Sequence, residues 1–259
     1  MSTFDQTTAV VQDRATIHPT WAQGRAAFGG VGAALALRAA ESLSEGRLLR
    51  AVQLSFNGPL APGEASVQAK LLRTGRSATQ VQAEVYSGEL AAISLLATYG
   101  EPRSTAVQFA APSAPAGPGP DDCFEMPYME GITPTFTQHF QYRWANQNLP
   151  FSGSKEARTD GYVRFRQPTA PDAAALLALI DAWPATVLGL MTSPAPASTM
   201  TWMVTLHGLP SADPEAWYRY VATTTAAGGG YADVDARLFG PSGELLASSR
   251  QLVAEFSKA

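Results

Sequence analysis

The sequence predicts an α+β protein in which one unit, a helix followed by four strands, occurs twice. Residues 88–96 and 243–251 share a Gly-Glu-Leu turn, followed by alanine and serine at the same spacing. A strand-like run ending in an aromatic residue, Tyr86 or Phe239, precedes each turn. An apolar helix and a β-rich run lie further upstream in both copies. This common order indicates duplication of one unit, with any site built where the copies meet.

The first copy begins with a helix of small residues over 28–40. Small side chains on all sides suit a helix wrapped by a sheet, because a surface helix would show a single apolar stripe. Residues 80–85 alternate glutamine or glutamate with valine or alanine, which is typical of a strand with one wet face. The strands predicted here are 48–57, 64–74, 78–87 and 90–99, after short β pieces at 7–11 and 15–18.

A linker rich in proline, glycine and alanine separates the two copies. Five prolines within 101–122 prevent regular strand pairing or a continuous helix. The predicted organisation is therefore an N-terminal unit (1–100), the linker, and a C-terminal unit (123–259). Proline in the first turn supports a helix over 171–183. The predicted strands of this unit are 136–144, 159–166, 199–208, 216–225, 230–239 and 244–256.

Composition limits the classes of function. A net charge of −4 gives no basic face for nucleic acid. A mean hydropathy of −0.05 and the lack of a long apolar run argue against a membrane span. The N-terminus shows no secretory signal, and a single cysteine fits a reducing cytoplasm. The three histidines show no metal-ligand spacing, so we expect neither metal nor cofactor.

The succession of motifs resembles the acyl-CoA thioesterase II-like family of double hotdog proteins. The resembling pieces in the first copy are FGG before the small-residue helix, then LLRTGRSATQVQAEVYSGELAAISLLATY. In the second copy they are LIDAWP, PASTMTWMVTLHG and YVATTTAAGGGYADVDARLFGPSGELLASSRQLV. The resemblance implies two tandem hotdog units, each a curved antiparallel sheet around a central helix. It also implies hydrolysis of acyl-CoA, and self-association as a dimer or tetramer.

The resemblance also implies site residues in the second copy. Family members use an Asp, a Thr and a Gln to orient and activate water. The Thr falls on Thr224 and the Gln on Gln251, whereas the Asp position falls on Thr201. A hydroxyl cannot take a proton from water as a carboxylate does. Asp181, in the apolar run LALIDAWP, is the candidate replacement, and capping of the helix end is its alternative role.

Two further groups are candidates for substrate binding. The helix start at Phe28, Gly29 and Gly30 offers free backbone N–H groups to a developing oxyanion. Arg73 and Arg76 lie in a predicted turn, where they would either meet CoA phosphates or stay solvated. The G-x-S-x-G and dinucleotide-binding patterns are incomplete in this sequence.

Three functions compete. The first is acyl-CoA hydrolysis. The second is acyl-CoA binding without catalysis, because the acid is missing at Thr201. A hotdog hydratase is the third, but neither helix start supplies the Asp–His pair that its chemistry needs.

Overall fold

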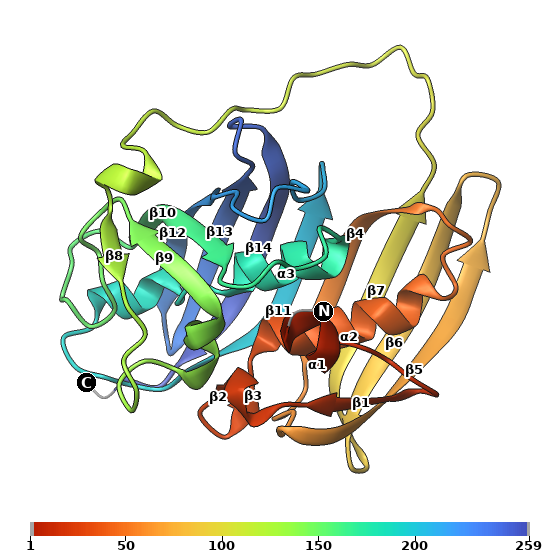
Figure 1. Cartoon of the computed structure of the whole chain (residues 1–259), viewed down its shortest axis with the longest axis horizontal. Coiled ribbons are helices and arrows are strands. Elements are labelled where there is room, and N and C mark those ends of the chain that lie inside the picture. The colour runs from red at the N-terminus through yellow and green to blue at the C-terminus, as the bar shows by residue number, and fades with distance from the viewer. Residues whose placement is uncertain (1–2, 258–259) are drawn as a thin grey trace.

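One antiparallel sheet of twelve strands forms the framework of the protein, and two helices pack on one of its faces (Figure 1). The computed structural model describes residues 3–257. Helix α2 (Gly29–Glu41) lies against the N-terminal half of the sheet, and α3 (Ala173–Asp181) lies beside α2 over the C-terminal half. The α+β class and the repeated helix-and-four-strand unit are thus confirmed.

The two copies are joined through one pair of strands, β4 and β11, so that their sheets form a single surface. The N-terminal half contains β1 (Arg14–Ile17), β4 (Leu48–Phe56), β5 (Gly63–Thr74), β6 (Ala78–Ser87) and β7 (Leu90–Gly100). The C-terminal half contains β8 (Phe124–Met126), β9 (Phe140–Trp144), β10 (Arg158–Phe165), β11 (Ala197–Leu206), β12 (Tyr218–Gly228), β13 (Tyr231–Phe239) and β14 (Leu245–Glu255).

Several short elements complete the fold, and two of them correct the sequence prediction. They are α1 (Thr3–Thr7), β2 (Ala22–Gln23), β3 (Ala26–Ala27) and the 3-10 helices η1 (Pro19–Trp21), η2 (Pro120–Asp122), η3 (Thr135–His139) and η4 (Thr186–Leu190). The strand predicted at 7–11 is wrong, because Thr7 ends α1 and Val11 makes only an isolated bridge to Arg14. The strand predicted from 136 begins only at Phe140, after η3.

The two helices run antiparallel and approach closely because their contact residues are small. A Cβ on Gly30 would lie 2.9 Å from Cα of Ala178, so only glycine fits there. At the other end of the pair, Arg38 of α2 bonds Asp172, which caps the N-terminus of α3 through Ala175 N–H. The start of α2 therefore meets the end of α3, and the end of α2 meets the start of α3.

The duplication extends to irregularities of the strands. The register of β4 slips between Leu49 and Ala51, and the register of β11 slips between Thr199 and Thr201. A second pair of slips falls at Leu71/Arg73 in β5 and at Thr224/Ala226 in β12. Because a β-bulge adds one residue and turns the following side chains to the other face, matched bulges define equivalent positions in the two copies.

Helix α3 and the residues after it form a long apolar stretch. Within residues 3–257, the segment 173–190 has the length and hydropathy of a membrane span, but 72% of it is buried in the protein. A core helix of a folded domain satisfies the same criteria. The segment is therefore weak evidence for membrane insertion.

The linker is held to the C-terminal half by hydrogen bonds from a buried, ion-paired arginine and from a tyrosine. Arg219 and Asp160 pair at 2.9 Å with side chains only 6% and 10% exposed. Arg219 also donates to the carbonyl oxygen of Pro115, and Tyr162 donates to that of Pro118. The 101–122 segment carries no strand, as predicted, and passes from β7 over the upper edge of the sheet in Figure 1.

We predict that Arg219→Met lowers the free energy of unfolding by about 3 kcal/mol, because it leaves Asp160 buried without its main partner. Arg158→Met is the matched control. Arg158 pairs with the same carboxylate but is 46% exposed, so its loss should cost less than about 1 kcal/mol. Urea unfolding of the full chain measures both. Equal losses in the two variants would contradict this ranking.

Candidate active site

Asp181 lies where the two copies meet, at the last residue of α3. A Cβ on Gly29 would lie 2.7 Å from Oδ2 of Asp181 and 3.4 Å from the ring of Phe56. The carboxylate thus touches the start of α2, where Phe28 provides no side-chain cap. The first turn of α2 therefore offers its N–H groups and its positive dipole end to a carboxylate of the other copy.

Gln251 approaches the same carboxylate from β14. Its Nε2 donates to Oδ1 of Asp181 at 3.0 Å. Gln251 pairs across the sheet with Trp202 of β11, which is 1% exposed, so both side chains point to the helix side of the sheet. Of the four catalytic candidates, the structure brings Asp181 and Gln251 together.

The setting of Asp181 favours a proton acceptor near neutral pH. Burial raises its pKa to about 6, and this outweighs the hydrogen bonds from Gln251 and from the backbone of Gly30, which favour the charged form. With a pKa of about 6, the Asp181 carboxyl group is mostly charged at pH 7 but can still receive a proton. Next to it, the Tyr142 hydroxyl donates a hydrogen bond to the carbonyl oxygen of Ala182.

Thr224 faces the same side of the sheet but lies farther from the carboxylate. It pairs with Val234, which pairs with Gln251, so Thr224 and Gln251 are two strands apart. Two strand spacings amount to about 10 Å between backbones. The Thr224 hydroxyl bonds that of Thr186 in η4 at 2.6 Å.

Thr201 lies on the opposite face of the sheet. It pairs with Leu252, and both side chains are exposed. The bulge between Thr199 and Thr201 reverses the alternation, so Thr199 faces inward although it is two residues away. The structure therefore does not bring Thr201 to Asp181 or Gln251.

Thr199 is a candidate that sequence reasoning missed. It pairs with buried Val253, which is two residues from Gln251 on the same face of β14. Such diagonal neighbours are about 7–8 Å apart, within reach of a glutamine side chain or of one bridging water. Thr199 is thus nearer by register to Gln251 than Thr224 is. Only the position of the bulge could have revealed this, and the sequence does not show it.

The substrate-binding candidates divide into two groups. Gly29 and Gly30 lie at Asp181, and Phe28 is buried beside them with its ring stacked on Phe136 at 4.1 Å. Arg76 lies beyond the C-terminal end of α2, where its carbonyl oxygen accepts from Arg47, and Arg73 lies three residues before it, near the end of β5. The start of α2 is about 20 Å away, given the rise of a 13-residue helix. The two arginines do not share a site with Asp181.

Other features do not join this constellation. A hollow of about 460 Å³ opens on the outer face of the C-terminal strands, lined by Thr223 and Thr225 among others, and so lies on the face opposite Asp181. Burial raises the pKa of Cys123, which disfavours its reactive thiolate form. Within residues 3–257, no cluster of three metal-ligating side chains occurs.

Comparison with known proteins identifies the family. The acyl-CoA thioesterase N-terminal domain matches residues 17–100, and the acyl-CoA thioesterase C-terminal domain matches residues 120–254. The two matches cover most of the chain, which therefore belongs to the acyl-CoA thioesterase family. The predicted family and the double hotdog fold are confirmed. No curated protein sequence matches the chain significantly.

Solved structures of similar proteins cover the whole chain. A hotdog-fold protein of unknown function from Alicyclobacillus acidocaldarius is 25% identical, covers 100% of both chains and has a TM-score of 0.88. A putative thioesterase II from Thermobifida fusca is 22% identical over 99% of this chain and 98% of its own, with a TM-score of 0.85. Acyl-CoA thioesterase II TesB2 from Mycobacterium marinum is 18% identical over 99% of both chains, with a TM-score of 0.76.

Proposed function

We propose that the protein hydrolyses acyl-CoA thioesters to a free acid and CoA, with Asp181 as general base. The observation that carries this proposal is the hydrogen bond from Gln251 to Asp181 at the start of α2. A carboxylate at a helix C-terminus is disfavoured both by burial and by the negative end of the dipole. The start of α2 and the amide of Gln251 offset part of this cost, and they leave a buried carboxylate with a pKa of about 6, as a general base near neutral pH needs.

The reaction uses water and the residues of this site. Asp181 takes a proton from a water molecule as its oxygen adds to the thioester carbonyl carbon. The Gly29 N–H and the positive end of α2 stabilise the developing oxyanion, because Val31 and Gly32 donate to Phe28 and Gly30 donates to Asp181. The C–S bond then breaks as the carbonyl re-forms, and the proton passes from Asp181 to the CoA thiolate. Gln251 holds the carboxylate in place, and its amide oxygen can accept a hydrogen bond from the water.

A hydroxyl group completes the proposed site, and there are two candidates for it. Thr199 lies nearer to Gln251 by strand register, and no hydrogen bond of its side chain is recorded among the described residues. Thr224, the candidate from the family resemblance, already bonds Thr186. We therefore propose Thr199 as the hydroxyl that helps to hold the water.

The competing function is acyl-CoA binding without hydrolysis. The sequence predicts this alternative because Thr201 occupies the position where the family has a catalytic Asp, so the acid is missing from that position. A carboxylate bonded to Gln251 supplies that acid and favours hydrolysis. A cytoplasmic location and self-association as a dimer or tetramer remain predictions from the sequence.

The proposal predicts that Asp181→Asn lowers kcat/KM about 10²- to 10⁴-fold, because asparagine cannot take the proton from water. Release of free thiol from acyl-CoA substrates of different chain lengths measures this. The wild-type rate should rise with pH through about 6, where Asp181 loses its proton, and then level off. This pH limb should be absent in Asp181→Asn.

Glu156→Gln provides the matched control. It also removes one carboxylate, but Glu156 is exposed and lies in a loop before β10, so its turnover and pH profile should match the wild type. Full turnover by folded Asp181→Asn would refute the role of this residue. Absence of turnover by the wild type on every chain length would instead support the non-catalytic binder.

The two threonines give separable predictions. Thr199→Val should lower kcat about tenfold through the loss of one hydrogen bond in the transition state. Thr224→Val should leave kcat within about twofold but lower the melting temperature, because buried Thr186 loses its partner. The reverse pattern would assign the hydroxyl to Thr224. Steady-state thiol release and thermal unfolding distinguish the two.

A further inference from the structure

The end of the helix pair opposite Asp181 has the same architecture but different chemistry. Glu41 ends α2 as Asp181 ends α3, and Glu41 lies near the start of α3, beside Arg38 and Asp172. Burial raises the pKa of Glu41, as it does for Asp181. The duplication has thus produced two related locations, one at each end of the pair.

The residues required for hydrolysis occur at only one of these locations. The matched bulges make Leu49 equivalent to Thr199, Ala97 to Gln251 and Leu71 to Thr224. All three polar side chains are therefore replaced by apolar ones at the Glu41 end. That end lacks counterparts of the Gln251 amide and of the two threonine hydroxyls.

The Glu41 end nevertheless contains an unused polar group. Tyr99 is 1% exposed, and its hydroxyl has no hydrogen-bond partner among the described residues. Burial, and then the nearby Glu41 carboxylate, raise the pKa of Tyr99, which pairs on the sheet with Thr79. A buried hydroxyl without a partner is costly, and a bound ligand can supply one.

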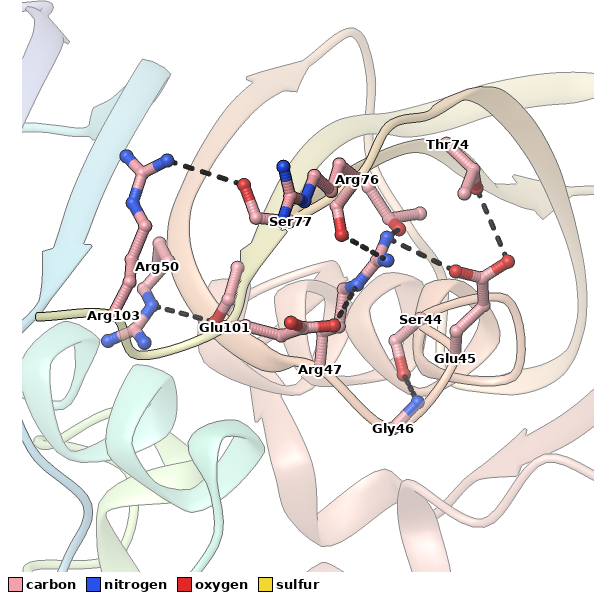
Figure 2. Close-up of polar contacts among 12 residues, drawn as sticks. Ser44, Glu45, Gly46, Arg47, Arg50, Thr74, Arg76, Ser77, Glu101 and Arg103 are labelled. Carbon is pink, nitrogen blue, oxygen red and sulfur yellow. Dashed lines mark hydrogen bonds and ion pairs between the residues drawn. The ribbon is translucent and has the colours of Figure 1, made fainter.

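Positive charge accumulates above this location (Figure 2). Arg47 lies just after α2 and pairs with both nearby carboxylates, Glu45 and Glu101, at 3.1 Å each. It also donates to the carbonyl oxygen of Arg76 and to the hydroxyl of Thr79. Arg47 thus neutralises both of these carboxylates. It also links the loop after α2 to the turn between β5 and β6.

Three arginines near Arg47 have no carboxylate partner among residues 3–257: Arg50, Arg76 and Arg103, here called the arginine patch. Arg103 donates to the hydroxyl of Ser77 at 3.3 Å, and Arg50 donates to the carbonyl oxygen of Gly100 at 3.0 Å. A Cβ on Gly100 would lie within 4 Å of both Arg50 and Ser77, so Arg50 lies near the residue that Arg103 bonds and that Arg76 precedes.

The duplication does not account for this charge. Glu101 N–H bonds the carbonyl oxygen of Ser77, and Glu255 N–H bonds that of Gly230, which makes Ser77 equivalent to Gly230. Arg76 then corresponds to Gly229. Arg50, at the bulge of β4, corresponds to Met200 at the bulge of β11. The arginine patch is therefore particular to the Glu41 end.

We propose that the arginine patch binds the phosphate groups of a small ligand at a second site, which does not hydrolyse it. Guanidinium groups together with a hydroxyl form charge-assisted hydrogen bonds that suit phosphate. The ligand class is a phosphate-bearing nucleotide, and CoA is the member that the proposed function would bring to the protein. Only this naming of CoA rests on the proposed function.

The test measures binding of adenosine 3′,5′-bisphosphate, CoA and inorganic phosphate by titration calorimetry on the full chain. In the triple variant Arg50→Gln, Arg76→Gln and Arg103→Gln, affinity for the bisphosphate should fall at least about tenfold. The control for overall charge removes three other positive charges, through Arg14→Gln, Lys70→Gln and Arg237→Gln. All three residues are exposed and lie outside the patch, so affinity should be unchanged.

Further readouts separate this inference from the proposed hydrolysis. Wild-type protein should bind CoA at two sites per chain and the triple variant at one, with thiol release at saturating substrate unchanged. Tighter binding of the bisphosphate than of inorganic phosphate identifies a nucleotide site, and equal binding identifies a site for free phosphate. Unchanged bisphosphate affinity in the folded triple variant, or loss of its turnover, would overturn the proposal of a separate site.

Discussion

The contact between the Asp181 carboxylate and the start of α2 is the constraint on which this architecture depends. A buried carboxylate at the end of α3 is unfavourable alone, and the amide of Gln251 and the N–H groups of α2 offset part of that cost. These groups come from both copies. The helix of one copy is therefore stabilised by contact with the helix of the other. Glycine at positions 29 and 30 permits this contact, because a larger side chain would separate the helices.

Duplication gave the protein two similar locations, and later divergence made them different. The bulges and the helix ends remain paired, whereas the side chains that surround them have changed. One end keeps an acid, an amide and hydroxyl groups, and the other combines an acid with apolar residues and arginines. A framework fixed by backbone pairing can accept such changes, because the inward side chains of the bulged strands can vary without altering the register.

Sequence patterns predicted the repeated unit, the linker and both main helices, since these depend on periodicity and on proline content. The apolar run around Asp181 made this residue the candidate acid, and the family resemblance pointed to Gln251, although seventy residues separate the two in the chain. Sequence patterns did not predict which face of the sheet a side chain occupies where a β-bulge adds one residue to a strand. Simple alternation puts Thr199 and Thr201 on one face, but the bulge between them puts them on opposite faces. Likewise, nothing local showed that Arg73 and Arg76 lie a full helix length from Asp181.

The central claim concerns the ionisation of one buried side chain, and carbon-detected NMR titration of labelled aspartate measures it directly. A carboxyl signal that is lost in Asp181→Asn should titrate with a midpoint near 6 in the wild-type protein. In Gln251→Leu the midpoint should rise further, because the hydrogen bond that favours the charged form is removed. A midpoint near 3.8 in the wild type would show a solvated carboxylate and contradict the account.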